Sequence, residues 1–357
     1  MNLVDSVVKV VTNASIIGAI VATIGTILLG YWLRKTNRLK EGAVKSLTTV
    51  TMTVALPLLA FNSFMTPLNQ KTLQQGMSVL IWGLLIYIIL IVTMPWLYAK
   101  YGKDERDVLG VLTSFGSTTF FGMPIVGAVY GAKGVMYASI FNIGYRIFLY
   151  SYAYIKMSGQ QLKGEHIKKM LLNPIVVATF LGLFLWLIQN AAPQVTAMVT
   201  DSKTGQASLQ HVAFFRLDAT MPWLYSWFKM MAALASPLAW LAIGGNLAQM
   251  SFGEALKNKT AWYYSFNKVI IVPIIMIVLT VITSAMGILP VDHIALATMV
   301  IMMATPVATV AVNYAMAFNR QSLLASNTSL ISTILATIFI PVWIIAVQLL
   351  GDLPLFK

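Results

Sequence analysis

The sequence predicts an all-α membrane protein of ten transmembrane helices, arranged as two inverted five-helix repeats in which helices 4 and 9 are broken and cross. Three observations lead to this prediction. The 357 residues are 58% hydrophobic and 10% charged, with a mean hydropathy of +0.79, whereas soluble domains carry roughly 25% charge. Apolar stretches of about 20 residues, enough to cross a bilayer, recur along the whole chain. Two of them contain a proline at corresponding places in the two halves of the chain.

Hydropathy places the ten spans in order, separated by short polar loops. The N-terminal stretch MNLVDSVVKVVTNASIIGAI carries Asp5 and Lys9 and shows no small-residue cleavage site, so we interpret it as the first helix rather than a signal peptide. The spans are expected at 11–33, 47–66, 77–99, 108–130, 134–157, 168–190, 222–250, 262–288, 293–317 and 322–350.

The distribution of basic residues predicts the orientation of these spans. Of the 24 Lys and Arg residues, fifteen fall in the loops on one side of the membrane and six on the other. Because cytoplasmic loops are enriched in Lys and Arg, both termini are expected outside. The net charge of +13 is then explained by topology, and nucleic acid is not an expected partner.

Short internal similarities divide the chain into two repeats, 1–160 and 161–357. TNASIIGAI near the start resembles LNPIVVATF, ALPLLAFNSF resembles ASPLAWLAIGGNLA, and YGAKGVMYAS resembles AFNRQSLLAS, all in the same order. Five spans per repeat is an odd number, so the second repeat must be inverted. Inverted repeats with interrupted helices are typical of secondary transporters.

The fourth span of each repeat carries the expected interruption, at Pro124 and Pro306. Two broken helices that cross near the membrane midplane expose backbone groups and helix N-termini to one cavity. Helix N-termini carry partial positive charge and free N–H donors, which suits an anion.

Arg146 is the main candidate for anion binding, since it lies deep within its predicted span and no acidic residue lies at comparable depth in any span. The alternative is that it reaches the interface or bonds to backbone carbonyls. Asn142 lies one helical turn away on the same face. Lys268 is expected to extend to the membrane surface. The expected substrate-binding residues are Ser117, Thr118, Thr119, Gly122, Met123, Pro124, Asn142, Arg146, Thr305, Pro306, Val307, Thr309, Asn62 and Asn246.

Several functional classes are disfavoured. The chain has no cysteine, which excludes disulfides and thiol catalysis. The three histidines fall in or beside loops, so no metal site is expected. No HExxH motif and no intramembrane Asp or His is present, so an intramembrane enzyme is not expected. A channel or receptor remains a rival, but matched broken helices fit alternating access better than a continuous pore.

Five stretches together resemble the auxin efflux carrier family, which includes plant PIN-type carriers and bacterial malate and malonate permeases. They are GYWLRKTNRLKEGAVKSLTTVTMTVALPLLAFNSF, GSTTFFGMPIVGAVYG, NPIVVATFLGLFLWL, SPLAWLAIGGNLA and ATPVATVAVNYAMAFN. Ser117 stands where the family often has Asn, and Thr119 where it often has Gly. The short loop at 157–168 resembles bacterial members rather than the plant carriers.

This resemblance implies a fold like that of bile-acid symporters and related antiporters, in which a transport domain moves against a scaffold like an elevator. It implies transport of a malate- or malonate-like carboxylate across the bacterial cytoplasmic membrane. A sodium-coupled symporter of the bile-acid type and an exporter of auxin-like aromatic carboxylates are the alternatives. The expected partners are a small organic anion and the lipid bilayer. A homodimer and coupling to H+ or Na+ are left open, and no cofactor is expected.

Overall fold

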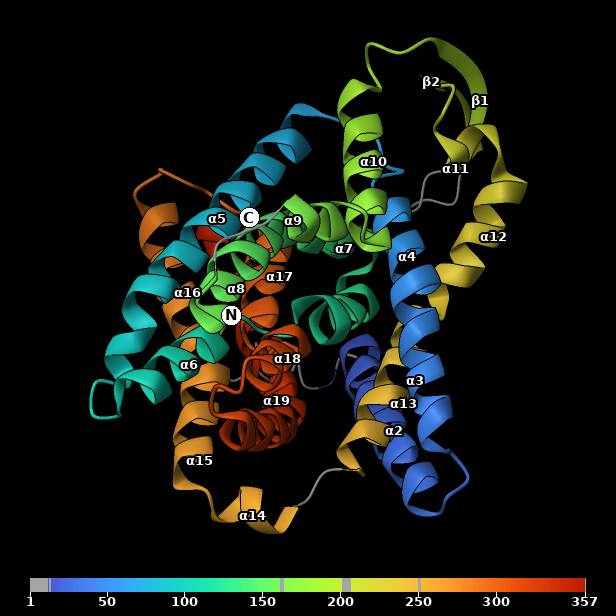
Figure 1. Ribbon diagram of the computed structural model, residues 1–357. Coiled ribbons are helices and arrows are strands. Elements are labelled where there is room, and N and C mark those ends of the chain that lie inside the picture. The colour runs from blue at the N-terminus through green and yellow to red at the C-terminus, as the bar shows by residue number, and fades with distance from the viewer. Residues whose placement is uncertain (1–11, 13, 161–163, 201–206, 250–251, 357) are drawn as a thin grey trace.

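The computed structural model is mostly helical and describes the whole chain except residues 1–11, 13, 161–163, 201–206, 250–251 and 357 (Figure 1). The first residues of the first expected span lie outside this described part. The expected boundary between the two repeats adjoins another of the gaps.

The first half of the chain contains eight α-helices and three wide π-helical turns, written η, among the described residues. They are α2 (Ala14–Lys35), α3 (Glu41–Val50), η1 (Thr51–Ala55), α4 (Leu56–Ser63), α5 (Gln70–Leu97), α6 (Lys103–Ser114), η2 (Thr118–Gly122), α7 (Met123–Phe148), η3 (Leu149–Ala153), α8 (Tyr154–Ser158) and, next to the gap, α9 (Gly164–Leu171).

The second half is helical too, with one short hairpin in the part that the structure describes. Its elements are α10 (Pro174–Ile188), β1 (Gln194–Thr200), β2 (Ala207–Ala213), α11 (Leu217–Thr220), α12 (Pro222–Ala233), α13 (Ala235–Leu247), α14 (Phe252–Lys257), α15 (Lys259–Phe266), the π-helical turn η4 (Asn267–Ile271), α16 (Val272–Ala285), α17 (His293–Met303), α18 (Thr309–Ala317), α19 (Ser322–Gly351) and the 3-10 turn η5 (Pro354–Phe356).

Seven helices in the described part are long and apolar enough to cross a membrane, so the chain is a multi-pass membrane protein. Two more apolar helices, α10 and α17, are shorter. One continuous helical segment, Thr118–Ser158, covers parts of two expected spans. Within it Gly131 leaves the helical region with φ 61° and ψ −152°, close to the loop that the sequence predicts between those spans.

The hairpin of β1 and β2 departs from the all-α expectation. The two strands pair antiparallel between α10 and α11, with Thr196 opposite His211. The β1 sequence QVTAMVT is rich in β-branched residues, which favour strands over helices. This composition is the signal for strand structure in a loop that hydropathy leaves unassigned.

The helices form two groups that lie side by side in Figure 1. One group contains α2, α3, α4, α10, α12 and α13, and the other contains α5, α6, α15, α16, α17 and α19, with most of α7 packed on α5 and α17. Each group has one very close helix pair. A Cβ on Gly244 of α13 would overlap the backbone of α2 at Ile27, and a Cβ on Gly83 of α5 would lie 2.6 Å from the Phe141 carbonyl oxygen of α7. Small residues allow such close helix packing in membranes.

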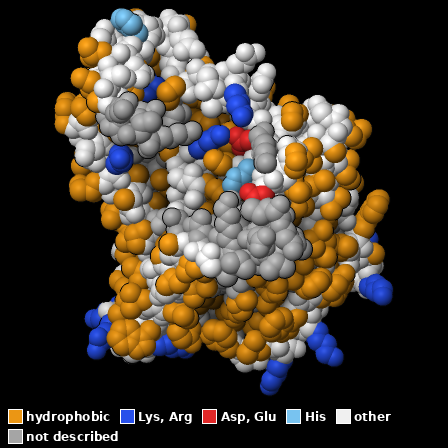
Figure 2. Space-filling view, turned by 180° about the vertical axis from the view of Figure 1, so that it is seen from behind, with side chains coloured by type: hydrophobic (Ala, Val, Ile, Leu, Met, Phe, Trp, Pro, Cys, Tyr) orange, Lys and Arg blue, Asp and Glu red, His pale blue; other side chains and the backbone are white. Residues whose placement is uncertain are grey.

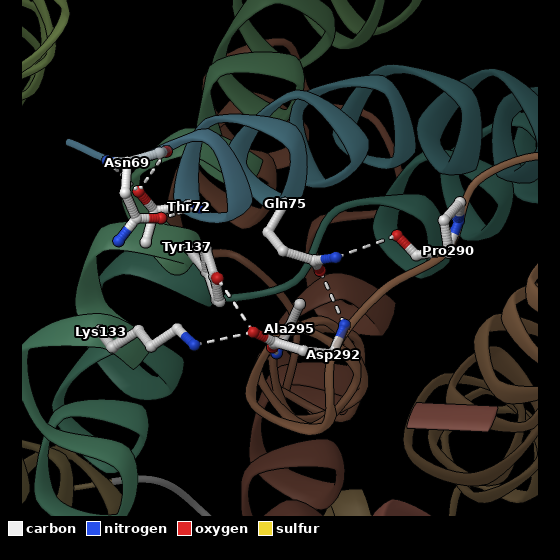
Figure 3. Close-up of polar contacts among 8 residues, drawn as sticks. All are labelled: Asn69, Thr72, Gln75, Lys133, Tyr137, Pro290, Asp292 and Ala295. Carbon is white, nitrogen blue, oxygen red and sulfur yellow. Dashed lines mark hydrogen bonds and ion pairs between the residues drawn. The ribbon is translucent and has the colours of Figure 1, made fainter. Parts of the chain in front are cut away.

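Loops that the sequence assigns to one side of the membrane meet around Asp292 (Figure 3). The Asp292 carboxylate caps α17 by accepting the Ala295 N–H at 2.8 Å, and it accepts from Lys133 Nζ at 2.7 Å and from the Tyr137 hydroxyl at 3.2 Å. The Asp292 N–H donates to Gln75 Oε1 at 2.7 Å. These contacts fix the start of α17 against α5 and α7.

A second cluster joins loops that the sequence assigns to the opposite side. Arg320 pairs with Asp104, the Gln321 amide donates to the same carboxylate at 3.0 Å, and Lys156 pairs with Asp107 at 3.0 Å. Hydrophobic side chains dominate the lower and lateral parts of the face shown in Figure 2, whereas charged and His side chains gather in its upper half and further Lys and Arg lie along its lower edge. A lipid-facing surface requires such hydrophobic parts.

Candidate functional site

The two helix breaks cross and hydrogen-bond to each other. The first break, residues 115–117, separates α6 from η2, and the second, residues 304–308, separates α17 from α18. The Ser117 N–H donates to the Pro306 carbonyl at 2.7 Å, and the Ala308 N–H donates to the Phe115 carbonyl at 2.9 Å. Gly116 and Val307 therefore form an antiparallel bridge. Backbone N–H and C=O groups that have lost their helical partners at the two breaks therefore bond to each other inside the protein. This is required because the membrane interior offers them no water.

The second break lies where the sequence predicts it, because Pro306 cannot donate to the helix and the residue before a proline is biased away from helical angles. The expected interruption at Pro124 is wrong. Pro124 lies in the first turn of α7, which continues directly from η2, and the actual break is centred on Gly116. Phe115 ends α6 with extended angles of φ −111° and ψ 107°, in the position needed to pair with Ala308.

Pro124 instead accompanies a π-helical turn. η1, η2 and η4 each end two residues before a proline, namely Pro57, Pro124 and Pro273. A proline removes one backbone N–H from the helical ladder, and a widened turn is one way to accommodate the unpaired carbonyl. At η4 the Val269 carbonyl, four residues before Pro273, accepts the indole N–H of Trp343 at 2.9 Å.

Two adjoining cavities, of about 240 and 330 Å³, lie beside the crossing point. They share Ser117, Phe120, Asn246 and Thr309 in their linings. Ser117 precedes η2, which packs on α7 and α17, and Thr309 begins α18, which packs on α19, so both lie with the second group. Asn246 belongs to α13 of the first group. The cavities therefore lie between the two groups of helices.

Both half-helices begin at these cavities without a side-chain cap. Ser117 precedes η2 and Ala308 precedes α18, and neither side chain bonds to the first turn. The first N–H groups of a helix have no partner within it and carry partial positive charge. The two N-termini thus present hydrogen-bond donors to the same space, which favours an anion.

Arg146 adds a full positive charge to the cavity of about 240 Å³. Its side chain comes from α7 and is 6% exposed. In the described part of the chain neither terminal nitrogen of its guanidinium has a hydrogen-bond partner, and Arg146 joins none of the ion pairs. A buried charge without a partner is costly, so the site suits a ligand carboxylate, which a guanidinium binds with two parallel hydrogen bonds.

The structure places half of the expected site residues at the two cavities and the rest elsewhere. Asn142 is fully buried; its amide lies 3.4 Å from the Thr119 hydroxyl, so it supports a cavity residue. The cavity-lining residues are Ser117, Thr119, Arg146, Asn246, Pro306, Val307 and Thr309. The expected residues that line neither cavity are Thr118, Gly122, Met123, Pro124, Asn142, Thr305 and Asn62.

Gly122 and Asn62 have other surroundings. A Cβ on Gly122 would lie 2.8 Å from Met302 Sδ and 2.9 Å from Thr305 Cγ2, so this glycine lets η2 approach α17. Asn62 lines a separate cavity of about 200 Å³ together with Ser63 and Lys229. Its position after a proline resembles that of Asn246 in sequence, but the fold places the two residues in different cavities.

Lys268 is a correction to the sequence-based expectation. The side chain does not reach the membrane surface: it is 0% exposed, and a Cβ on Gly116 would lie 3.0 Å from its Nζ. Residue 268 lies within η4, on the side of the helix that packs into the protein. Hydropathy shows how deep a residue lies along a span, but not which way it faces.

Other lining residues were missed by sequence reasoning. Tyr150 and Asn173 line the cavity beside Arg146, and Asn313 and Thr333 line the adjoining one. Asn173 caps α10, its side chain accepting the Ile175 N–H at 3.0 Å. A polar residue at the start of an apolar span was visible in the sequence, but its approach to Arg146 depends on the tertiary structure.

The comparison with protein families agrees with this architecture. The family described as "Membrane transport protein" matches residues 15–167 and 161–344, nearly the whole chain. The chain belongs to the auxin efflux carrier family. This family is one of membrane transporters, so the cavities at the crossing helices are the place to expect its substrate. No curated protein matches the chain.

Proposed function

We propose that this carrier moves a small organic anion, a carboxylate of malate or malonate size, across the bacterial cytoplasmic membrane. One observation carries the proposal: the unpaired guanidinium of Arg146 faces a cavity at which two uncapped helix N-termini converge. The cavity beside Arg146, about 240 Å³, is smaller than the roughly 300–1,000 Å³ of sites for drug-sized ligands. The space directly beside Arg146 therefore suits a small acid, and the adjoining cavity of about 330 Å³ extends it.

The proposed mechanism is alternating access of the elevator type. The cavities lie between the two helix groups: Ser117, Arg146 and Thr309 line them from one group, and Thr48 and Asn246 from the other. If the group with the broken helices slides as a unit, it carries Arg146 and the crossing point past the stationary group. The close contact of Gly83 in α5 with α7 and the clusters around Asp292 and Asp104 join helices within that moving group, whereas the contact of Gly244 with α2 joins helices of the stationary group.

The proposed topology has ten spans in two inverted repeats, 1–160 and 161–357, with both termini outside. The long apolar helices supply seven spans. The other three come from α10, from the pair α17–α18, and from dividing the helical segment Thr118–Ser158 into two spans at Gly131. Cysteines introduced at Met1 and Lys357 should react with an impermeant reagent in intact cells. Protection of both would mean the opposite orientation, and protection of one would mean an odd number of spans.

The direct test of the proposed substrate class is a thermal-shift series on purified protein with mono- and dicarboxylates. A ligand that binds only the folded state stabilises it by about 2.7 kcal/mol at a concentration one hundred times its dissociation constant. Saturable, counterflow-competent uptake into liposomes should follow for the acids that stabilise. Stabilisation only by neutral or cationic solutes would refute the proposed function.

A further inference from the structure

Lys268 lies directly behind the crossing point of the two broken helices. Its side chain is fully buried, and an added Cβ on Gly116 would touch both Lys268 and the hydroxyl of Thr305. Gly116 is the second residue beyond the end of α6, and Thr305 is the second residue beyond the end of α17. The ammonium group therefore lies close to the C-terminal ends of both half-helices.

The surroundings of Lys268 supply no acidic partner. The ion pairs of the described chain do not include it, and its Nζ has no hydrogen-bond partner among the described residues. Each helix C-terminus carries a partial negative charge. Two such termini at one place form an environment for a cation, and here the protein provides the cation itself.

The position of the ammonium group is fixed by the local helix geometry. Lys268 belongs to the π-helical turn η4, whose Val269 carbonyl is bound by the Trp343 indole of α19. Wide turns of this kind occur frequently at functional sites. The turn and its anchor to α19 hold the residue facing the crossing point.

Lys268 and the anion cavity lie on opposite sides of the crossing backbone. Ser117 lines both cavities, whereas its neighbour Gly116 faces Lys268, and Lys268 lines neither cavity. The ammonium group is therefore shielded from direct contact with a ligand beside Arg146. Its influence on that ligand must be electrostatic, through the breaks that separate them.

We propose that Lys268 is a tethered cation that takes the place of a separately bound metal ion at the crossing point. It neutralises the two helix C-termini, so that the N-termini and Arg146 dominate the field in the cavity and an anion binds without Na+. This inference deepens the proposed function and rests on it.

The first test compares Lys268→Met with Lys229→Met, an exposed lysine of α12 remote from the crossing point. Lys268→Met keeps an unbranched side chain that is one atom shorter and removes the charge. The dissociation constant for the stabilising carboxylate should rise about tenfold, as expected for a unit charge about 10 Å away at an effective dielectric constant of about 20. The melting temperature without ligand should change little, because losing the attraction to the two helix C-termini offsets the relief of no longer burying a charge. Lys229→Met should bind like the wild type.

The second test is chemical rescue of Lys268→Ala. This change deletes three carbons and the nitrogen, a fragment equal to n-propylammonium. Millimolar n-propylammonium should restore anion binding to Lys268→Ala, while bulkier tetramethylammonium should not, and neither should affect the wild type. Wild-type binding should be equal in sodium and choline buffers.

The outcomes separate the two proposals. If wild type binds carboxylates and Arg146→Met does not, the proposed function stands. The tethered-cation proposal is then overturned by wild-type affinity in Lys268→Met, by a sodium requirement in the wild type, or by failure of n-propylammonium to rescue. If both Lys268→Met and Lys268→Gln failed to fold, the ammonium would be a structural requirement, which also contradicts the proposal.

Discussion

Replacing Arg146 by methionine should produce two effects of opposite sign. The variant should lose anion binding, yet the ligand-free protein should be as stable as the wild type or more stable. Arg146 is 6% exposed and its terminal nitrogens have no partner among the described residues. Removing an unpaired buried charge relieves a desolvation cost, whereas an ordinary structural arginine would leave a destabilised protein.

The size of the binding loss follows from the contacts that the guanidinium can make. Hydrogen bonds to charged groups contribute about 1.5–3 kcal/mol, so the dissociation constant should rise about 10- to 150-fold. At a ligand concentration one hundred times the wild-type dissociation constant, a hundredfold loss of affinity reduces the ligand stabilisation from about 2.7 to about 0.4 kcal/mol. A thermal-shift titration resolves this difference.

Arg216 provides a matched control. It is 4% exposed, but its guanidinium makes two hydrogen bonds to Asp218, at 2.7 and 2.6 Å. Arg216→Met should lower the melting temperature, since it strands the carboxylate of Asp218, and should leave anion affinity unchanged. If Arg146→Met instead lost stability and kept its affinity, Arg146 would be a structural residue and the carboxylate would bind elsewhere.

Two further pairs of variants test the geometry of the site. Pro306→Ala should weaken anion binding more than Pro124→Ala, because Pro306 lies in the break itself while Pro124 follows a π-helical turn. Isothermal titration of the two folded variants measures their dissociation constants. Equal constants, or a larger loss of affinity in Pro124→Ala, would contradict this prediction. Asn246→Ala should reduce affinity several-fold, because Asn246 lines both cavities, whereas Asn62→Ala, in a separate cavity, should not. Loss of affinity in Asn62→Ala alone would move the site to the other cavity.

The sequence by itself determined the membrane class and the resemblance to the auxin efflux carrier family, which the family match confirms. It also singled out Arg146 as the candidate charge for anion binding. These follow from local properties. Long apolar stretches can be stable only in lipid, and an arginine deep in such a stretch, with no acidic residue at its depth, needs a partner wherever the helix faces. The crossing at Pro306 was also predictable, because a proline interrupts hydrogen bonding in its own helix.

Only the tertiary structure decided where the first break lies, which asparagine joins the site and where Lys268 points. The break at 115–117 exists because its backbone groups find partners at 306–308, some 190 residues further along the chain. Asn62 follows the π-helical turn η1, and Lys268 lies within the π-helical turn η4, so a regular helical periodicity misplaces both residues. Hydrogen bonds between distant segments and the rotation of one helix against another are not encoded in any short stretch of sequence.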